Sequence, residues 1–138
     1  YLQTSTGFVF KKVSGSWNVS NPVMNLRTLD SRTLTITHTV NLTPDLDEHD
    51  IYQITALAAA VNINAPSQTQ TINGQKVLFM IRDNGTSRAL TWSPVFVPLN
   101  GAVTLPTATV PGKWLYVAAI RNTAAVGIFH VLYVDSES

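Results

Sequence analysis

The chain contains no cysteine and carries little charge. Without cysteine there is no disulfide framework, no thiolate zinc site and no cysteine nucleophile. It has 9 lysines and arginines and 8 aspartates and glutamates, which gives a net charge of +1 and a charged share of only 12%. The basic residues form no run. We therefore expect no nucleic-acid partner, because such binding requires many phosphates to be neutralised along one face.

Long apolar runs are also lacking. No uninterrupted apolar stretch approaches the roughly 18 residues of a membrane span. The opening residues do not place a basic segment before an apolar one, as a signal peptide would. We expect neither a membrane span nor a signal peptide, and a first residue other than Met suggests a processed chain or part of a longer one.

Much of the polar content of the chain comes from threonine and not from charged residues. The chain has 17 threonines, as many as all of its charged residues together. Threonine is β-branched and fits a pleated, half-buried surface, so this bias predicts strands. Hydroxyl and methyl groups are also cheaper to remove from water than ions are, which favours contact with another copy of the chain.

The length of 138 residues suits a single core. Residues 1–31 are predicted to form an N-terminal arm or hairpin, since turn residues interrupt two short apolar stretches there. Residues 32–138 are predicted to form an all-β domain, specifically an antiparallel β-sandwich of jelly-roll-like type. Short strands separated by frequent turns leave no room for helical crossovers.

Two segments show the alternation of a strand with one buried face. In residues 32–42, apolar side chains alternate with threonine and asparagine, and His38 falls on the apolar side. In residues 51–63 a run of alanines interrupts the larger apolar residues. We favour one strand over a helix there, because no N-cap and capping-box pattern precedes the segment. The alanines expected where another sheet or subunit approaches closely are Ala56, Ala58 and Ala60.

Turn chemistry punctuates the rest of the chain at Asn73-Gly74, Asp83-Asn84-Gly85, Asn100-Gly101 and Pro111-Gly112. The Asp-Asn-Gly turn is predicted to close a hairpin. The strands predicted between these turns are 75–82, 87–92, 103–105, 113–121 and 126–134.

Catalytic and metal-binding patterns are weak. The acidic run Asp45–Asp50 is best interpreted as a charged turn, with a hard cation as the alternative, because it lacks the spacing of a calcium loop. The histidines His38, His49 and His130 have no ligand-spaced partner. We expect His38 to be buried or at an interface, satisfied by a backbone carbonyl, with a pH switch as the alternative. With no nucleophile elbow, phosphate loop or paired carboxylates, we expect no catalytic residues and no cofactor.

The tryptophans are the residues that a sugar-binding face would need. Trp92 and Trp114 lie among apolar neighbours and are expected in the core. Trp17 lies between Ser16 and Asn18 and is expected to pack on a partner subunit. The candidate interface residues are therefore Trp17 and the three alanines named above.

Several strings resemble a domain that recurs in structural proteins of tailed bacteriophages, often beside tail-fibre or tail-spike regions. The resemblance covers about residues 45–134, and the most specific string is Asp83-Asn84-Gly85-Thr86 followed by Arg88-Ala89-Leu90-Thr91-Trp92. The segment Ser93–Pro98 departs from the family's pattern. The other matching strings are Ile54–Ala60, Asn73–Leu78, Leu105–Thr107 and Lys113–Val117.

This resemblance implies a non-enzymatic virion module, in a tail fibre, a spike or a capsid decoration. It implies a homo-oligomer, which we expect to be a homotrimer, that contacts other virion proteins in particle assembly or host attachment. The alternative is a carbohydrate-binding module that recognises a host-surface glycan through the loops around 66–72 and 94–101.

Overall fold

The computed structural model describes residues 32–68, 73–99, 101, 103–122 and 127–138, and the backbone of three strands before residue 20. Every regular element in this part of the chain is a β-strand, so the all-β prediction is confirmed. The chain divides into two units, Tyr1–Asp30 and Ser31–Ser138. The boundary lies one residue before the one that the sequence predicts.

The first unit is a small antiparallel sheet in the order β1-β2-β3, formed by β1 (Leu2–Gln3), β2 (Val9–Val13) and β3 (Ser16–Val19). Strands β2 and β3 correspond to the hairpin predicted there.

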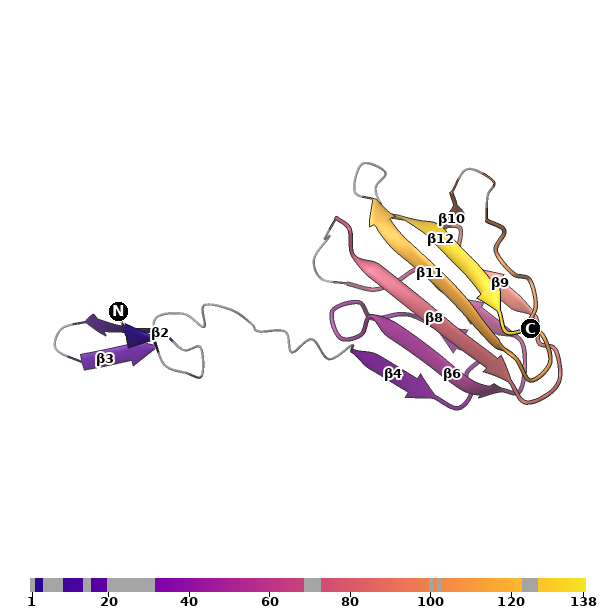
Figure 1. Ribbon diagram of the computed structural model, residues 1–138, viewed down its shortest axis with the longest axis horizontal. Coiled ribbons are helices and arrows are strands. Elements are labelled where there is room, and N and C mark those ends of the chain that lie inside the picture. The colour runs from indigo at the N-terminus through magenta and orange to yellow at the C-terminus, as the bar shows by residue number, and fades with distance from the viewer. Residues whose placement is uncertain are drawn as a thin grey trace. The chain divides into compact units, whose positions relative to one another are not determined.

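The second unit contains two sheets (Figure 1). The large sheet has the order β10-β12-β11-β8-β6-β4, and the small sheet has the order β5-β7-β9. Their strands are β4 (Thr33–Ile36), β5 (Asn41–Leu42), β6 (Ile51–Leu57), β7 (Val61–Ile63), β8 (Lys76–Asp83), β9 (Leu90–Trp92), β10 (Phe96–Pro98), β11 (Trp114–Asn122) and β12 (Ile128–Ser136).

The chain makes three similar passes through both sheets. Each pass runs through the large sheet (β4, β6 or β8) and then crosses to the small sheet (β5, β7 or β9), and strands in equivalent positions pair in parallel. Parallel neighbours need a long return connection, and here the small sheet lies on that return path. The predicted antiparallel pairing is wrong for these strands. It holds for β8 with β11 and for β11 with β12.

Each predicted long strand is broken at a corner between the sheets. The segment 32–42 forms β4 and β5, and the segment 51–63 forms β6 and β7. The corners stack through backbone bonds, with the Ala56 amide donating to the Thr37 carbonyl and the Asn62 amide to the Val40 carbonyl, both at 2.9 Å. In residues 32–42 the apolar alternation of the sequence continues through the corner, so periodicity alone does not reveal it. In residues 51–63 the buried positions shift by one residue at the corner, from Tyr52 and Ile54 to Leu57, Val61 and Ile63.

The later strands differ from the prediction in three places. Strands β8 and β9 lie in different sheets, so the Asp83-Asn84-Gly85 turn is a corner and not the tip of a hairpin. Residues 103–105 form no strand. Strand β10 was not predicted; it pairs in parallel with β12, at the edge of the large sheet.

One hydrophobic cluster lies between the two sheets. Large-sheet residues such as Ile54 and Phe79 and small-sheet residues such as Leu42 and Ile63 belong to the same buried cluster. Its aromatic rings meet mostly at tilted or edge-to-face angles, at centroid distances of 5.4–6.0 Å. Within the described residues, no helix has the length and hydropathy needed to cross a membrane.

Candidate functional site

Of the residues predicted at an interface, Trp17 belongs to the first unit and the three alanines belong to the second. The backbone of Trp17 pairs with Lys12 in the first unit, and its side chain lies outside the described residues. Ala56 is half-buried in β6, whereas Ala58 and Ala60 are exposed at the corner before β7. The close neighbour of this corner is the preceding corner of the same chain, since the Ala58 amide donates to His38 Nδ1 at 3.1 Å.

His38 is not buried, and its hydrogen bond differs from the predicted one. The side chain is exposed, and its Nδ1 accepts a hydrogen bond from a backbone amide instead of donating to a carbonyl. It follows the end of β4, where the chain leaves the large sheet, so its place in the apolar alternation no longer directs it into the core. His49 packs edge-on against Tyr52, and His130 lies within 3.5 Å of the Asn122 amide. The structure brings no two of these histidines together.

The acidic turn is organised by one arginine. Arg32 binds Asp50 with two nitrogens, at 2.8 and 2.6 Å, and donates to the carbonyls of Leu46 and Asp47. The neighbouring carboxylate favours the charged guanidinium and raises the pKa of Arg32. No group of three or more acidic or histidine side chains in the described part of the chain could hold a metal ion. This arrangement is that of a charged turn closed by an ion pair.

Tyr52 anchors the same turn from inside the core. It is 1% exposed, and its hydroxyl donates to the Asp45 carbonyl at 2.6 Å. Burial raises the pKa of this phenol to about 12, with the negative charges of Asp45 and Asp50 acting in the same direction. The folded state therefore prefers the neutral phenol more strongly than the unfolded state does.

Replacing Tyr52 with phenylalanine is expected to lower the free energy of unfolding by about 1 kcal/mol at neutral pH, because the Asp45 carbonyl loses its donor. Since the folded pKa lies above the unfolded one, the contribution of Tyr52 is present below pH 10 and is lost as pH rises toward 12. Urea unfolding from pH 8 to 12 should show a steeper alkaline decline for the unmodified chain than for Tyr52→Phe. Tyr116→Phe is the control and should retain the steep decline.

A second buried polar network surrounds Asp83, which is 3% exposed at the end of β8. Its carboxylate accepts hydrogen bonds from the Gly85 amide at 2.9 Å, the Gly112 amide at 2.7 Å and the Thr109 hydroxyl at 2.5 Å. Burial raises the pKa of Asp83, but these three bonds and the positive charge of Arg88 outweigh burial and hold the pKa below its ordinary value. The network connects the corner between β8 and β9, which we call the third corner, to the loop before β11.

The outer face of the small sheet carries a ladder of amides and hydroxyls. Asn41, Asn62 and Thr91 are neighbours in register, and the Asn62 amide donates to the Asn41 side-chain oxygen at 3.1 Å. Beyond them, the Asn64 amide donates to the Thr43 hydroxyl at 2.9 Å. Parallel stacking of the passes brings like side chains side by side.

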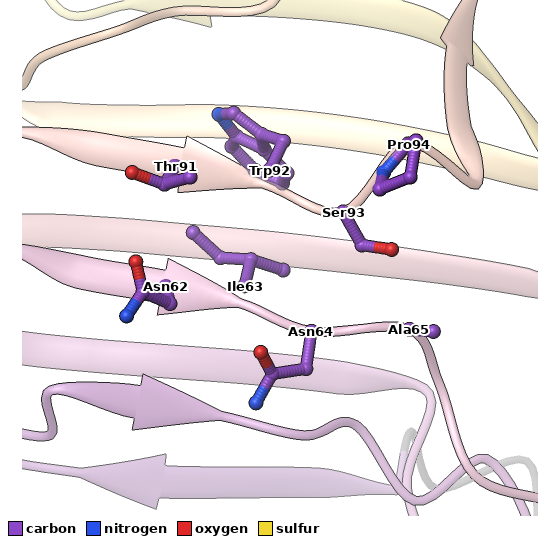
Figure 2. A pocket seen from close by; sticks show the side chains of 8 residues that line it. All are labelled: Asn62, Ile63, Asn64, Ala65, Thr91, Trp92, Ser93 and Pro94. Carbon is purple, nitrogen blue, oxygen red and sulfur yellow. The ribbon is translucent and has the colours of Figure 1, made fainter.

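This ladder borders a shallow cavity of about 340 Å³, which we call the amide groove (Figure 2). Figure 2 shows that two neighbouring extended segments form it, with Asn62 and Asn64 on one and Thr91 and Ser93 on the other. Trp92 also lines the groove, and its indole nitrogen donates to the Pro106 carbonyl at 2.8 Å. The Trp92 ring itself packs against Phe79 and Phe96 of the core, so the groove presents mainly hydrogen-bonding side chains.

A second cavity, of about 430 Å³, adjoins the amide groove at Ala65, and we call it the Arg121 cavity. It is lined by Ala65, Pro66, Ser67, Gln68, Val95, Arg121, Gly127 and Phe129. Parts of both loops predicted for glycan contact, residues 66–68 and 94–95, line the two cavities. Residues 69–72 of the first loop lie outside the described residues.

The face of the large sheet that points away from the core, which we call the outer face, has apolar side chains at its centre. In register across the strands, Ile51, Leu78, Ala118 and Tyr133 form one row, and Met80 and Tyr116 stand side by side in the next. Tyr133 is 51% exposed. Trp114 lies on this outer face, contrary to its predicted place in the core, with the guanidinium of Arg82 5.9 Å from its ring centroid. The apolar residues of the outer face are Ile51, Leu78, Met80, Trp114, Tyr116, Ala118, Ile120, Ile128 and Tyr133. It also carries Thr33, Thr35, Gln53, Thr55, Lys76, Arg82, Asn122, His130 and Asp135.

Comparisons with protein-family models, curated proteins and solved structures return no match.

Sequence reasoning did not predict Arg121 or Asp83 as site residues. Arg121 lies at an inward position of β11, and the strict alternation of that strand from Trp114 to Asn122 was the available signal. For Asp83 the signal was a carboxylate in the turn Asp83-Asn84-Gly85, where a side-chain oxygen commonly binds the backbone two residues ahead.

Proposed function

We propose that this chain is a non-enzymatic structural module of a tailed-phage virion that assembles as a homotrimer. The observation that carries the proposal is the apolar outer face of the large sheet, which has Leu78, Met80 and Tyr116 at its centre. Lys76, Arg82 and Asp135 lie at its margins, so an apolar centre is bordered by charges, as in protein interfaces. The resemblance to phage structural domains supplies the biological setting.

The shape of the unit supports the same proposal. The two sheets share one core, which supports placing the unit among the β-sandwiches, with stacked parallel passes in place of jelly-roll pairing. A threefold arrangement in which each large sheet turns its outer face toward the axis removes these apolar side chains from water. Burial of apolar area is the main favourable term in such association.

The proposal is tested by native mass spectrometry of the purified chain at micromolar concentration, with and without EDTA. A trimer that chelation leaves intact is the expected result, because the contacts proposed are apolar and need no metal. A monomer at this concentration would contradict self-assembly through the outer face.

A second candidate function, glycan binding, is favoured by the amide groove. Amides and hydroxyls in a row suit the hydroxyl groups of a sugar. No aspartate or glutamate lines either described cavity, so we propose binding without hydrolysis, which generally requires two carboxylates. A host-surface glycan is the ligand of this candidate function.

A further inference from the structure

The Arg121 cavity contains buried polar atoms without partners. Arg121 is 8% exposed, and its Nε has no hydrogen-bond partner. Both side-chain polar atoms of Gln68, on the same cavity, are also buried and unpaired. Buried polar groups are nearly always hydrogen-bonded, so unpaired ones in one cavity need an explanation. One explanation is a ligand that supplies the missing hydrogen-bond partners.

The charge of Arg121 is compensated only in part. Its guanidinium carbon lies 5.6 Å from the centroid of the Phe129 ring, a cation–π contact. No carboxylate is among the described residues that line the cavity, and the one ion pair among the described residues joins Arg32 and Asp50, at the acidic turn. A buried cation without an anion is costly, so an anionic ligand gains more here than at an exposed arginine.

We propose that the Arg121 cavity binds the carboxylate of an acidic sugar, a hexuronic acid within an oligosaccharide. The planar fork of a guanidinium matches a carboxylate in two parallel hydrogen bonds. The cavity volume of about 430 Å³ lies within the ordinary range for small-ligand sites. The Gln68 amide supplies both a donor and an acceptor for the neighbouring ring oxygens and hydroxyls.

The adjoining amide groove favours a sugar over an acidic peptide. The two cavities meet at Ala65, so a ligand whose carboxylate lies in one extends naturally into the other. There it meets Asn62, Asn64, Thr91 and Ser93, whose side chains suit hydroxyl groups. This inference rests on the glycan-binding candidate function and names its ligand class.

The test is isothermal titration of the full chain with short oligogalacturonates and oligoglucuronates, each compared with its methyl-esterified, uncharged form. At least one acid form is expected to bind about tenfold more tightly than its ester, because esterification removes one charge-assisted pair. Arg121→Lys, which keeps the charge but loses the fork, should weaken binding of the acid to near the level of the ester.

Gln68→Glu provides a second variant that keeps the proposal testable if Arg121→Lys disturbs folding. It places a carboxylate on the wall of the same cavity, where it competes with the ligand for Arg121, so acid binding should fall about tenfold with no loss of thermal stability. Asn84→Asp makes the same amide-to-carboxylate change at an exposed position outside both cavities and should leave binding unchanged.

The possible results distinguish failure of this inference from failure of the glycan-binding candidate function. Equal binding of acid and ester, unaffected by both variants, would overturn the inference and leave glycan binding standing. If no oligosaccharide binds, both fail. If polyglutamate binds through Arg121 while the sugars do not, the ligand is an acidic peptide and the inference is wrong.

Discussion

Asp83→Ala is expected to lower the free energy of unfolding by about 3–5 kcal/mol, the range for breaking a buried charged network by removing one member. The substitution leaves two backbone amides and the Thr109 hydroxyl without their acceptor inside the protein. It also removes the negative charge beside Arg88. Urea unfolding at neutral pH measures the change.

The same carboxylate predicts an acid-sensitive stability. Because the folded pKa of Asp83 lies below its ordinary value of 3.8, its ionisation stabilises the folded state above that value, and the contribution is lost as pH falls through the folded pKa. Asp83→Asn retains one acceptor oxygen and removes the charge. It should therefore cost less than alanine and flatten the decline in stability between about pH 4 and pH 2.

Asp135→Ala is the matched control for Asp83. Asp135 is exposed on β12, where it accepts hydrogen bonds from the Tyr133 hydroxyl and the Ser136 amide. Its loss should cost less than about 1 kcal/mol, the usual range for a surface position. If both alanine variants lose similar stability, burial of the Asp83 network is not what stabilises the third corner.

Met80→Lys is expected to convert the trimer to a monomer at micromolar concentration. Met80 lies on the outer face beside Tyr116, so a lysine there would place a charge in the middle of the proposed interface. An interface centre that must bury an unpaired charge loses at least about 2 kcal/mol of association free energy, or roughly thirtyfold in affinity. Native mass spectrometry and light scattering measure the oligomeric state.

Two controls distinguish loss of the interface from loss of the fold. Met80→Leu preserves the apolar face and should remain trimeric. Thr91→Lys introduces the same charge on the outer face of the small sheet and should also remain trimeric, while weakening any ligand in the amide groove. If Met80→Lys remains trimeric, assembly uses another surface. If Met80→Lys unfolds, Tyr133→Lys tests the same face at a more exposed position.

The two proposed functions use different surfaces of the second unit. The proposed assembly uses the outer face of the large sheet, whereas the proposed ligand binding uses the groove outside the small sheet and the cavity next to it. A module that joins copies through one sheet and presents the other to a glycan is consistent with attachment at the surface of a particle. The variants of Met80 and of Arg121 test the two functions independently.

The sequence by itself determined that the chain forms β-strands and where several of its turns lie. Threonine content and alternation predicted strands, and the described turn glycines Gly74, Gly85, Gly101 and Gly112 all have positive φ, as their dipeptides require. These properties depend on neighbours one or two residues apart, which a sequence displays directly.

Only the tertiary structure decided how the strands pair and which polar groups meet. The alternation of residues 32–42 is the same whether they form one strand or turn a corner, so the parallel passes were not visible in it. Asp83 meets Thr109 and Gly112, which lie 26 and 29 residues away. Arg121, in β11, and Gln68, which follows β7, line one cavity although they are far apart in the sequence. Such partners are selected by packing across the whole core, and local periodicity contains no information about them.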